Sequence, residues 1–218
     1  MSYTFDKTWD KIYRNKEQLN IYPYSDFVSF YIKNFSKKKN INFLEIGCGF
    51  GNNLIVPSSL NHNVYGIDAS KNVIELVKNR FMSNNKIKIF KQDFTNLKFK
   101  NNTFDFILNR ESLTTTNYKN AKKAINQCYK KLKKNGLFYS TFVTNLNQFN
   151  GIKINDMHEK LKGNFQNVNK LRFYNIFEIK NIFEENFFKL EKVYLNQQID
   201  YLDSPINTTS HWVVIAKK

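Results

Sequence analysis

Three of the chain's 7 glycines fall close together in the stretch FLEIGCGFGNN. Gly47, Gly49 and Gly51 directly follow an apolar run that ends around Glu45. Glycine is used where the backbone needs a positive φ or where another group must approach it closely. The spacing G-x-G-x-G differs from the G-x-G-x-x-G of dinucleotide-binding turns, and an acid beside a pyrophosphate would be repulsive. The turn therefore predicts a ligand that brings positive charge close to the backbone.

Two further acids follow the next two apolar runs along the chain. Asp68 ends the run NVYGID, and Asp93 lies in KQDF just beyond KIKIF. A carboxylate placed like Asp68 can accept hydrogen bonds from both hydroxyls of a ribose, a spacing that by itself fits NAD equally well. Asp93 is suited to accept from an adenine amino group, and the backbone N–H of Phe94 is suited to donate to the ring. Because no phosphate-binding lysine accompanies these acids, we expect an adenosine that carries an amino acid and a positive charge.

The elements that must position these residues alternate between strand-like apolar runs and helical stretches. This alternation predicts an α/β fold with a mostly parallel sheet and helices on both faces, in which ligands bind at the carboxyl ends of the strands. Strands are expected at residues 41–46, 63–68, 86–90, 103–109, 137–143, 187–195 and 211–218. A helix is expected after Gly51, and Pro57 limits its length. Three further helices are expected, at 70–81 with Ser70 as N-cap, at 117–136 with Gly136 as C-cap, and at 175–185.

The composition is that of one folded domain. A chain of 218 residues with 41% hydrophobic residues can bury a full core. Two cysteines, Cys48 and Cys128, cannot form a disulfide framework, and three scattered histidines lack metal-ligand spacing, so no metal site is predicted.

The N-terminal stretch has no apolar signal core, and no apolar run reaches the roughly 18 residues of a transmembrane helix. We therefore expect a cytoplasmic protein without a membrane partner, whose oligomeric state the sequence leaves open.

The formal charge is +16, from 34 Lys and Arg against 18 Asp and Glu. Such an excess is typical of proteins that bind nucleic acid, an anionic surface or an anionic substrate. The lysines are spread along the whole chain, however, and solvated lysine without a specific partner explains that distribution equally simply. Any affinity for RNA is accordingly expected to be weak and electrostatic.

Four motifs, in their order and spacing, resemble one known family. The stretches LEIGCGFGNN, VYGIDAS, KQDFTNL and TFDFILNR resemble class I S-adenosylmethionine (SAM)-dependent methyltransferases of the small-molecule methyltransferase-domain type. The resemblance covers residues 40–143 well and continues weakly to the last strand. It implies a Rossmann-like sheet of seven strands in the order 3-2-1-4-5-7-6, with the seventh antiparallel. It also implies a single domain: a helical lid at 1–40, a SAM-binding core at 41–143, an insertion or acceptor lid at 144–174, and a C-terminal helix and strands at 175–218.

The resemblance also implies roles for individual residues around SAM and its product S-adenosylhomocysteine (SAH). The three glycines would shape the loop around the methionine part, and Glu45 would orient that loop and the amino group. Asp68 would bind the ribose, with Ala69 lining the pocket. Asp93 and Phe94 would hold the adenine, and Asn109 would lie at the end of the fourth strand, facing the methyl group.

The acceptor side is expected at the same end of the sheet. Methyl transfer from a sulfonium is a direct displacement that requires alignment and the exclusion of water, and a base only if the nucleophile starts protonated. Arg110 could hold an anionic group and Glu111 could accept a proton, or the two could simply pair. His211 reaches this end if the last strand is antiparallel, whereas His62 precedes the second strand and is expected at the surface.

Aromatic residues near the N-terminus, including Trp9 and Tyr13, are expected mainly to pack. As part of a lid, they could also attract a sulfonium through their rings.

Three functions remain open at this point. The leading hypothesis is an enzyme that methylates O or N of a small, anionic, polar acceptor, such as a sugar, a nucleotide-linked or a phosphoryl compound, for example in surface polysaccharide synthesis. The second is an RNA methyltransferase, supported by the charge. The chain lacks the N/D-P-P-Y/F motif after the fourth strand and a Pro-Cys pair for cytosine C5, which disfavours two nucleic-acid chemistries. The third is a SAM-binding module without catalysis.

Overall fold

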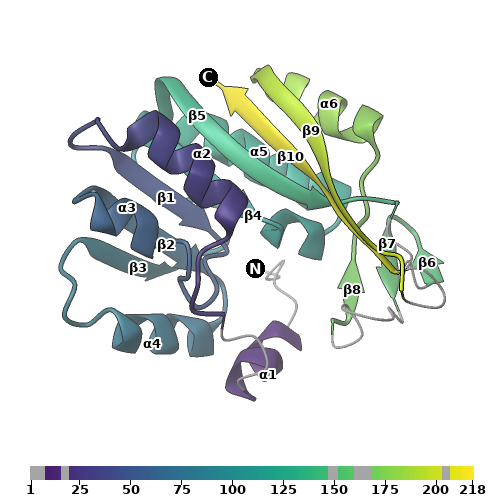
Figure 1. The fold of residues 1–218 in the computed structure, drawn as a ribbon, viewed down its shortest axis with the longest axis horizontal. Coiled ribbons are helices and arrows are strands. Elements are labelled where there is room, and N and C mark those ends of the chain that lie inside the picture. Colours follow the sequence, from purple (N-terminus) through teal and green to yellow (C-terminus); the bar gives the residue numbers. More distant parts are fainter. Residues whose placement is uncertain (1–7, 16–19, 147–151, 160–167, 203–206) are drawn as a thin grey trace.

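The computed structural model describes residues 8–15, 20–146, 152–159, 168–202 and 207–218. A seven-stranded sheet runs through the molecule and carries helices on both faces (Figure 1). Its strands are β1 (Asn42–Ile46), β2 (Asn63–Asp68), β3 (Ile87–Lys91), β4 (Phe104–Arg110), β5 (Leu132–Val143), β9 (Lys189–Asp200) and β10 (Asn207–Lys217). The helices are α1 (Thr8–Arg14), α2 (Ser25–Phe35), α3 (Ile55–Ser59), α4 (Lys71–Arg80), α5 (Tyr118–Lys131), α6 (Ile176–Glu184) and the short 3₁₀ helix η1 (Ser112–Thr115).

The strand order confirms the expected topology. Reading across the sheet, the order is β3-β2-β1-β4-β5-β10-β9, so β10 takes the place of the seventh strand and β9 that of the sixth. The first five strands are mutually parallel, and β10 runs antiparallel to both β5 and β9. The strand numbers run to ten because three short strands of another sheet lie between β5 and β9 in the chain. The carboxyl ends of β1, β2 and β4 therefore meet at one edge, where a ligand is expected.

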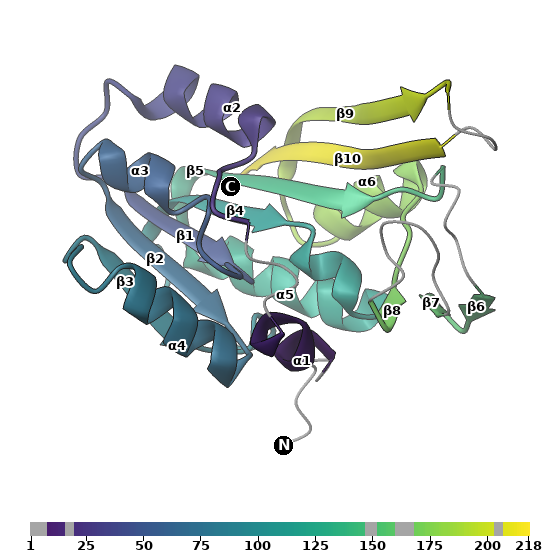
Figure 2. The ribbon, with the colours of Figure 1, turned by 60° about the horizontal axis from the view of Figure 1, so that its bottom comes forward.

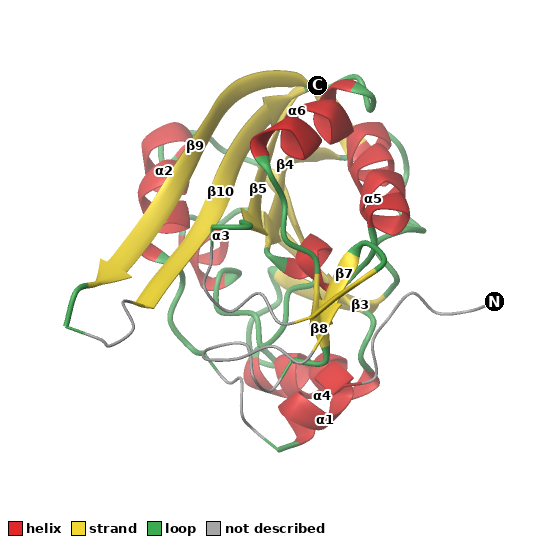
Figure 3. Cartoon of the chain, turned by 90° about the vertical axis from the view of Figure 1, so that its right-hand side faces the viewer, coloured by secondary structure: helices red, strands yellow, loops and turns green. Residues whose placement is uncertain are grey.

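Two apolar clusters fix the helices on the two faces of the sheet. On one face, α5 and α6 pack through side chains such as Ile125 and Ile182 against strand residues such as Phe138. On the other face, α2 and α4 pack through side chains such as Phe27 and Val77. Figure 3 shows the sheet between α2 and the α5–α6 pair. Since α2 belongs to this core, only α1 keeps the lid interpretation that we gave to residues 1–40.

Local signals place most helices, with one correction. Ser70 caps α4 as expected, because its hydroxyl accepts from the Val73 N–H at 3.1 Å. The helix predicted at 117–136 instead ends at Lys131, and Gly136 is not its C-cap. Leu132 turns to extended backbone, is fully buried and pairs with Phe104 of β4. Burial of that side chain starts β5 early, so the segment around Gly136 is an irregular beginning of the strand.

The prediction for His62 was also wrong. Its side chain is 1% exposed rather than at the surface. Nδ1 lies 2.9 Å from the hydroxyl of Tyr31, and Nε2 lies 3.0 Å from the carbonyl oxygen of Lys38. The histidine therefore joins α2 and the following loop to β2, a contact between distant segments that position along the chain does not reveal.

The segment 144–174 contributes a second, small sheet. Its strands are β6 (Ile152–Ile154), β7 (Met157–Glu159) and β8 (Lys170–Leu171), all antiparallel neighbours. Figure 2 shows this sheet at the end of the molecule toward which β9 also runs. Buried Arg172 fixes it, since its guanidinium pairs with Asp156 and with Glu178 of α6. None of the helices described is long and apolar enough to cross a membrane.

Candidate active site

A cavity of about 330 Å³ lies at the carboxyl ends of β1, β2 and β4. It is bounded by the glycine turn, by α1, by η1 and by residues of the insertion. The residues that line it are Trp9, Tyr13, Tyr24, Gly47, Asp68, Ala69, Gln92, Phe94, Arg110, Glu111, Ser112, Thr114, Thr115, Val143, Val168 and Leu171. Its size is that of a small-molecule site.

The glycine turn needs glycine for two separate reasons. Gly47 and Gly49 have φ values of +64° and +51°, which side chains rarely tolerate. A Cβ at Gly47 would also stand 2.4 Å from the Cβ of Ser112, and one at Gly49 would stand 2.4 Å from the hydroxyl of Tyr13. The turn is thus approached from one side by η1 and from the other by α1. The close approach that the glycines predicted comes partly from the protein itself.

Glu45 lies on β1 just before the glycine turn and is not among the described residues that line the cavity. It is 2% exposed, and Oε1 accepts from the side-chain amide of Asn53 at 2.7 Å. Oε2 is buried without a hydrogen-bond partner among the described residues. Burial raises the pKa of Glu45 to about 8, against the opposing effect of the Asn53 hydrogen bond. A buried carboxylate with an unused oxygen favours a cationic group beside it.

Asp68 supports the turn and lines the cavity. Its Oδ1 accepts from the Ser70 N–H at 2.9 Å and its Oδ2 from the Gly49 N–H at 3.3 Å. Burial raises the pKa of Asp68 to about 6, although these backbone hydrogen bonds act in the opposite direction. Ala69 follows it in the cavity wall. The carboxylate is therefore held in place by the backbone and presented to a ligand.

The residues predicted to hold an adenine separate in the structure. Phe94 lines the cavity, together with Gln92, which sequence reasoning had not singled out. Asp93 is not among the lining residues, and its Oδ1 accepts from both the N–H and the hydroxyl of Thr95 at 2.8 Å. These bonds shape the loop after β3, and its role as a direct adenine ligand stays a prediction.

Asn109 requires a correction, because it does not reach the cavity. It is fully buried, its amide donates to Ser140 Oγ at 2.7 Å and to the Thr141 carbonyl at 3.2 Å. Its oxygen accepts from the Ser112 hydroxyl and from the Leu113 N–H. All of its hydrogen-bonding capacity is used inside the protein. Asn109 therefore positions the β4–η1 turn instead of contacting a cofactor.

Arg110 and Glu111 both line the cavity, and they pair with each other there. The guanidinium of Arg110 also donates to Thr141 Oγ1 at 3.0 Å and lies 4.1 Å from the centre of the Tyr24 ring. Its Nε is buried with no hydrogen-bond partner in the described part of the chain. Glu111 has a φ of +61°, an uncommon conformation for a residue other than glycine. The pairing that we left open thus exists, but it lies in the cavity wall.

His211 reaches the cofactor end of the sheet, as the antiparallel last strand predicted. It pairs with Val143 of β5, which lines the cavity, although His211 itself does not. Nδ1 lies 4.0 Å from Glu111 Oε1, and Nε2 lies 3.6 Å from Asp26 Oδ2. His211 therefore stands behind Glu111 as seen from the cavity.

Asp26, at the start of α2, is a site residue that sequence reasoning missed. Its Oδ2 also accepts from the hydroxyl of Tyr139 at 3.2 Å. Burial raises the pKa of Asp26, but the hydrogen bond from His211 and the charge of Arg110 outweigh burial and lower it to about 2. Asp26 is therefore ionised throughout the physiological pH range. No local pattern signals this role, because the partners lie far apart in the chain.

The insertion and the N-terminal segment both contribute to the walls of the cavity. The insertion contributes Val168 and Leu171, which agrees with its interpretation as part of the acceptor side. The aromatic residues of the N-terminal segment contribute Trp9, Tyr13 and Tyr24. The described residues that line the cavity include Arg110 and no lysine.

Comparison with known proteins identifies similar sequences and folds. Residues 44–140 match the family model described as "Methyltransferase domain". A phosphoethanolamine N-methyltransferase from Plasmodium falciparum is 30% identical over 104 residues, which span 47% of this chain and 39% of that protein. A SAM-dependent methyltransferase structure from Methanosarcina mazei has a TM-score of 0.72 at 16% identity, covering 90% of this chain and 98% of that one.

A further solved structure contains the product of methyl transfer. A Burkholderia thailandensis 1,6-didemethyltoxoflavin-N1-methyltransferase, solved with 1,6-didemethyltoxoflavin and SAH, has a TM-score of 0.69 at 11% identity. It covers 95% of this chain and 84% of its own. At such low identities the likeness concerns the fold.

Proposed function

We propose that the chain is a SAM-dependent methyltransferase, which transfers a methyl group from SAM to O or N of a small polar acceptor with an anionic group; the match of residues 44–140 to a methyltransferase domain supports this. The observation that carries the proposal is that Arg110 and Glu111 line the same cavity as Asp68 and the glycine turn. The residues suited to hold the cofactor and those suited to hold the acceptor thus adjoin in one cavity. The activity and the acceptor are proposals, since the curated relative matches over only part of its length.

The residues of the cofactor side fit SAM. The unpartnered Oε2 of Glu45 suits the ammonium of its methionine part, and the carboxylate of Asp68 suits the ribose hydroxyls. Ala69 and Phe94 supply an apolar wall suited to the adenine. When bound, SAM supplies an electrophilic methyl group on a sulfonium. The protein's contribution is to bind, to orient and to exclude water.

Arg110 is suited to hold an anionic group of the acceptor. Its Nε is a buried donor without a partner, and contact with Tyr24 and Thr141 fixes the plane of the guanidinium. A guanidinium held in this way binds carboxylate or phosphate with defined geometry. The relative from Plasmodium is named for phosphoethanolamine, which joins a phosphate to an amine. An acceptor of that kind would satisfy Arg110 and present a nitrogen to the methyl group.

Glu111 is the group suited to take a proton from the acceptor. Its carboxylate is at the cavity wall, next to Arg110. His211 lies behind it and is flanked on its other side by Asp26. In this arrangement His211 and Asp26 act through Glu111. They orient its carboxylate, and they favour passage of the acceptor's proton from Glu111 away from the cavity. His211 is accordingly a positioning residue in this proposal, not a group in contact with the acceptor.

The two alternatives have less support. Methylation of RNA would be favoured by a basic surface beside the cavity, whereas the lining residues described include one arginine and no lysine. A module without catalysis would be favoured by a blocked acceptor side. The cavity instead continues from the glycine turn to Arg110, Val143 and Leu171.

An activity measurement with radiolabelled SAM would test the proposal. Purified protein would be incubated with phosphoethanolamine, ethanolamine, sugar phosphates, the matching free sugars and RNA. We expect label to be transferred to a phosphorylated small molecule and not to its dephosphorylated counterpart. Transfer to RNA alone, or binding of SAH without transfer to any acceptor of these classes, would contradict the proposal.

A further inference from the structure

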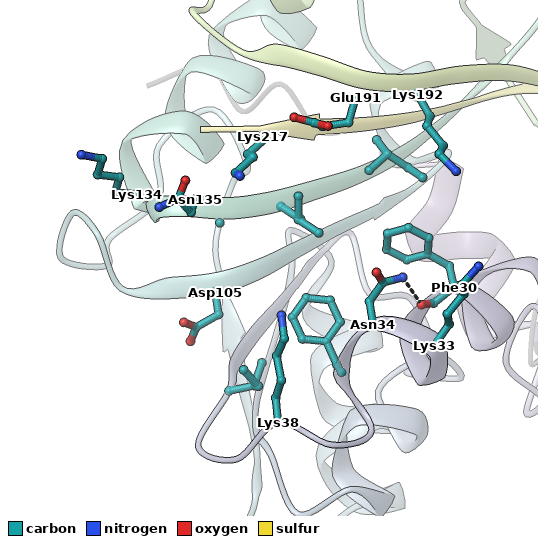
Figure 4. Close-up of a pocket in the computed structure, with 15 residues that line it drawn as sticks. Phe30, Lys33, Asn34, Lys38, Asp105, Lys134, Asn135, Glu191, Lys192 and Lys217 are labelled. Carbon is teal, nitrogen blue, oxygen red and sulfur yellow. Dashed lines mark hydrogen bonds between the residues drawn. The ribbon is translucent and has the colours of Figure 1, made fainter.

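A second concave surface lies at the opposite end of the sheet from the candidate active site. It has a volume of about 690 Å³ and is formed where the loop after α2 faces the first part of β5, the beginning of β9 and the end of β10. Figure 4 shows this basic groove, which we define by the lysines Lys33, Lys38, Lys134, Lys192 and Lys217 among its lining residues. Its volume falls within the range of about 300–1,000 Å³ that is common for small-molecule sites.

The lysines of the basic groove come from five different segments. Lys33 lies on α2, Lys38 on the loop that follows, and the other three on β5, β9 and β10. In Figure 4, Lys38 and Lys217 extend toward the cavity from opposite sides, whereas Lys134 turns outward. Only the fold brings these segments together, so the groove is not one charged run of the sequence.

The two acids that line the groove, Asp105 and Glu191, already pair with lysines other than the five that define it. Asp105 accepts from Lys133 Nζ at 2.8 and 2.9 Å and from the Asn42 N–H at 2.9 Å. Glu191 lies 3.1 Å from Lys189 Nζ. Within the part of the chain that the structure describes, none of the five groove lysines forms an ion pair with a carboxylate. The groove therefore concentrates positive charge that the protein itself does not compensate.

We propose that the basic groove binds a compact polyanion, a small molecule with two or more linked phosphate groups. One monoanion would neutralise a single ammonium group, whereas linked phosphates can meet several at once. A single strand of nucleic acid would use aromatic faces for base stacking. Phe35 is 3% exposed and already stacks on Tyr31 with ring centres 4.9 Å apart, so it offers no such face. Phe30, which also lines the groove, is half-buried and packs against Tyr139 with ring centres 5.1 Å apart, so the described lining offers one partly covered ring beside five lysines. The groove therefore favours a short, densely charged ligand over a strand.

The groove is separate from the proposed methyl transfer. It lies at the amino ends of β4 and β5, whereas the candidate active site lies at the carboxyl ends of the parallel strands. The two cavities share no lining residue. Binding in the groove can therefore be tested independently of whether the chain methylates an acceptor.

Calorimetric titration with tripolyphosphate at about 0.15 M salt tests the proposal, because exposed long-range charge is largely screened there. Orthophosphate and a short single-stranded RNA would be titrated in parallel. The test variant is Lys38→Glu/Lys217→Glu. The matched control is Lys78→Glu/Lys180→Glu, which changes the total charge equally at two exposed helical lysines outside the groove. Thermal unfolding and SAH affinity, which should change little in either variant, report on folding.

We expect tripolyphosphate to bind more tightly than orthophosphate, the groove variant to lose at least about tenfold in affinity, and the control to remain within about twofold. Should charge reversal unfold the groove variant, Lys38→Gln/Lys217→Gln would replace it, with an expected loss of about threefold. Equal losses in groove and control variants would overturn the proposal, since they would mean general attraction to a basic protein. So would the absence of binding, or tighter binding of RNA through the same lysines.

Discussion

The two sides of the candidate active site leave opposite kinds of atom without a partner. On the proposed cofactor side, Oε2 of Glu45 is buried without a hydrogen-bond partner among the described residues, and it is an acceptor once the carboxyl group is ionised. On the proposed acceptor side, the buried atom without a partner among the described residues is Nε of Arg110, a donor. A buried polar atom without a partner costs free energy, so each side gains most from a ligand of complementary charge. The cofactor side therefore favours a cation and the acceptor side an anion.

The remaining charges of the two sides also differ. The carboxylates of Glu45 and Asp68 receive hydrogen bonds from neutral groups alone, and their pKa values are raised by burial to about 8 and about 6. Glu111 instead faces charged or chargeable partners, Arg110 and His211. The charged groups of the proposed acceptor side thus already face one another, apart from Nε of Arg110, which lacks a partner among the described residues. On the proposed cofactor side, the charge of Glu45 and Asp68 is left for a ligand to complement.

The largest effect is expected from Arg110→Ala. Loss of a charge-assisted anchor should lower kcat/KM by roughly 2–4 kcal/mol in transition-state terms, whereas SAH affinity should change much less. Steady-state kinetics with the acceptor and calorimetry with SAH separate the two effects. If the variant instead loses SAH affinity and keeps its acceptor kinetics, Arg110 belongs to the cofactor side and the division described above is wrong.

A smaller effect is expected from Asp68→Ala on the cofactor side. The variant loses charge-assisted hydrogen bonds to the ribose, which should weaken SAH binding by about 1.5–3 kcal/mol. Asp68→Asn, which keeps one acceptor oxygen for the turn, serves as the control and should lose less. Unchanged affinity for SAH in both variants, measured by calorimetry, would exclude Asp68 as a ribose ligand.

The raised pKa of Glu45 predicts that SAH affinity depends on pH. In the free protein Glu45 is mostly protonated below about pH 8, and a bound ammonium favours its ionised form. Binding should therefore release a proton, and affinity should rise with pH by up to about tenfold per unit until the pH reaches the pKa of the free protein. Titrations in buffers of different ionisation enthalpy measure the proton release. Glu45→Gln should abolish the dependence; a wild-type affinity that falls as pH rises would refute the assignment.

The smallest effect is expected from Asp26→Asn. The substitution keeps an oxygen that can accept from Tyr139 but removes the charge 3.6 Å from His211 Nε2. If His211 acts through Glu111 as proposed, kcat should fall by roughly three- to tenfold, within the range of general acid–base contributions, while the acceptor KM and SAH affinity stay nearly unchanged. Tyr139→Phe is the matched control, with a weaker effect. A change confined to KM would assign Asp26 to acceptor binding.

The positions in the fold of the residues proposed for the cofactor side were largely predictable from the sequence, because their signals are local. Glu45, the glycines and Asp68 lie at strand ends that apolar runs identify, and a parallel sheet brings consecutive strand ends to one edge. Even there, Asn109 was misplaced because its hydrogen bonds to β5 depend on a neighbouring strand. The end of α5 was misjudged for a similar reason, since burial of Leu132 against β4 outweighs the helical pattern.

The acceptor side could be predicted only in part, because its contacts join segments far apart in the chain. His211 was brought to the correct end by the antiparallel strand, but nothing near Asp26 in the sequence indicates that it faces His211. Likewise, no periodicity shows that the hydroxyl of Tyr13 approaches Gly49. Such contacts arise from the packing of α1 and α2 around the sheet, which strand and helix patterns do not specify.

The position of β10 between β5 and β9 bears on how the protein is assembled during synthesis. The strands that carry Glu45, the glycine turn and Asp68 lie within residues 42–68, and their neighbours β3 and β4 are complete by residue 110. His211 joins the sheet only when residues 207–217 have left the ribosome, and β9 can attach only through them. Chains emerge from their N-terminus, so a nascent chain contains every strand of the cofactor side well before it contains the strand that completes the acceptor side.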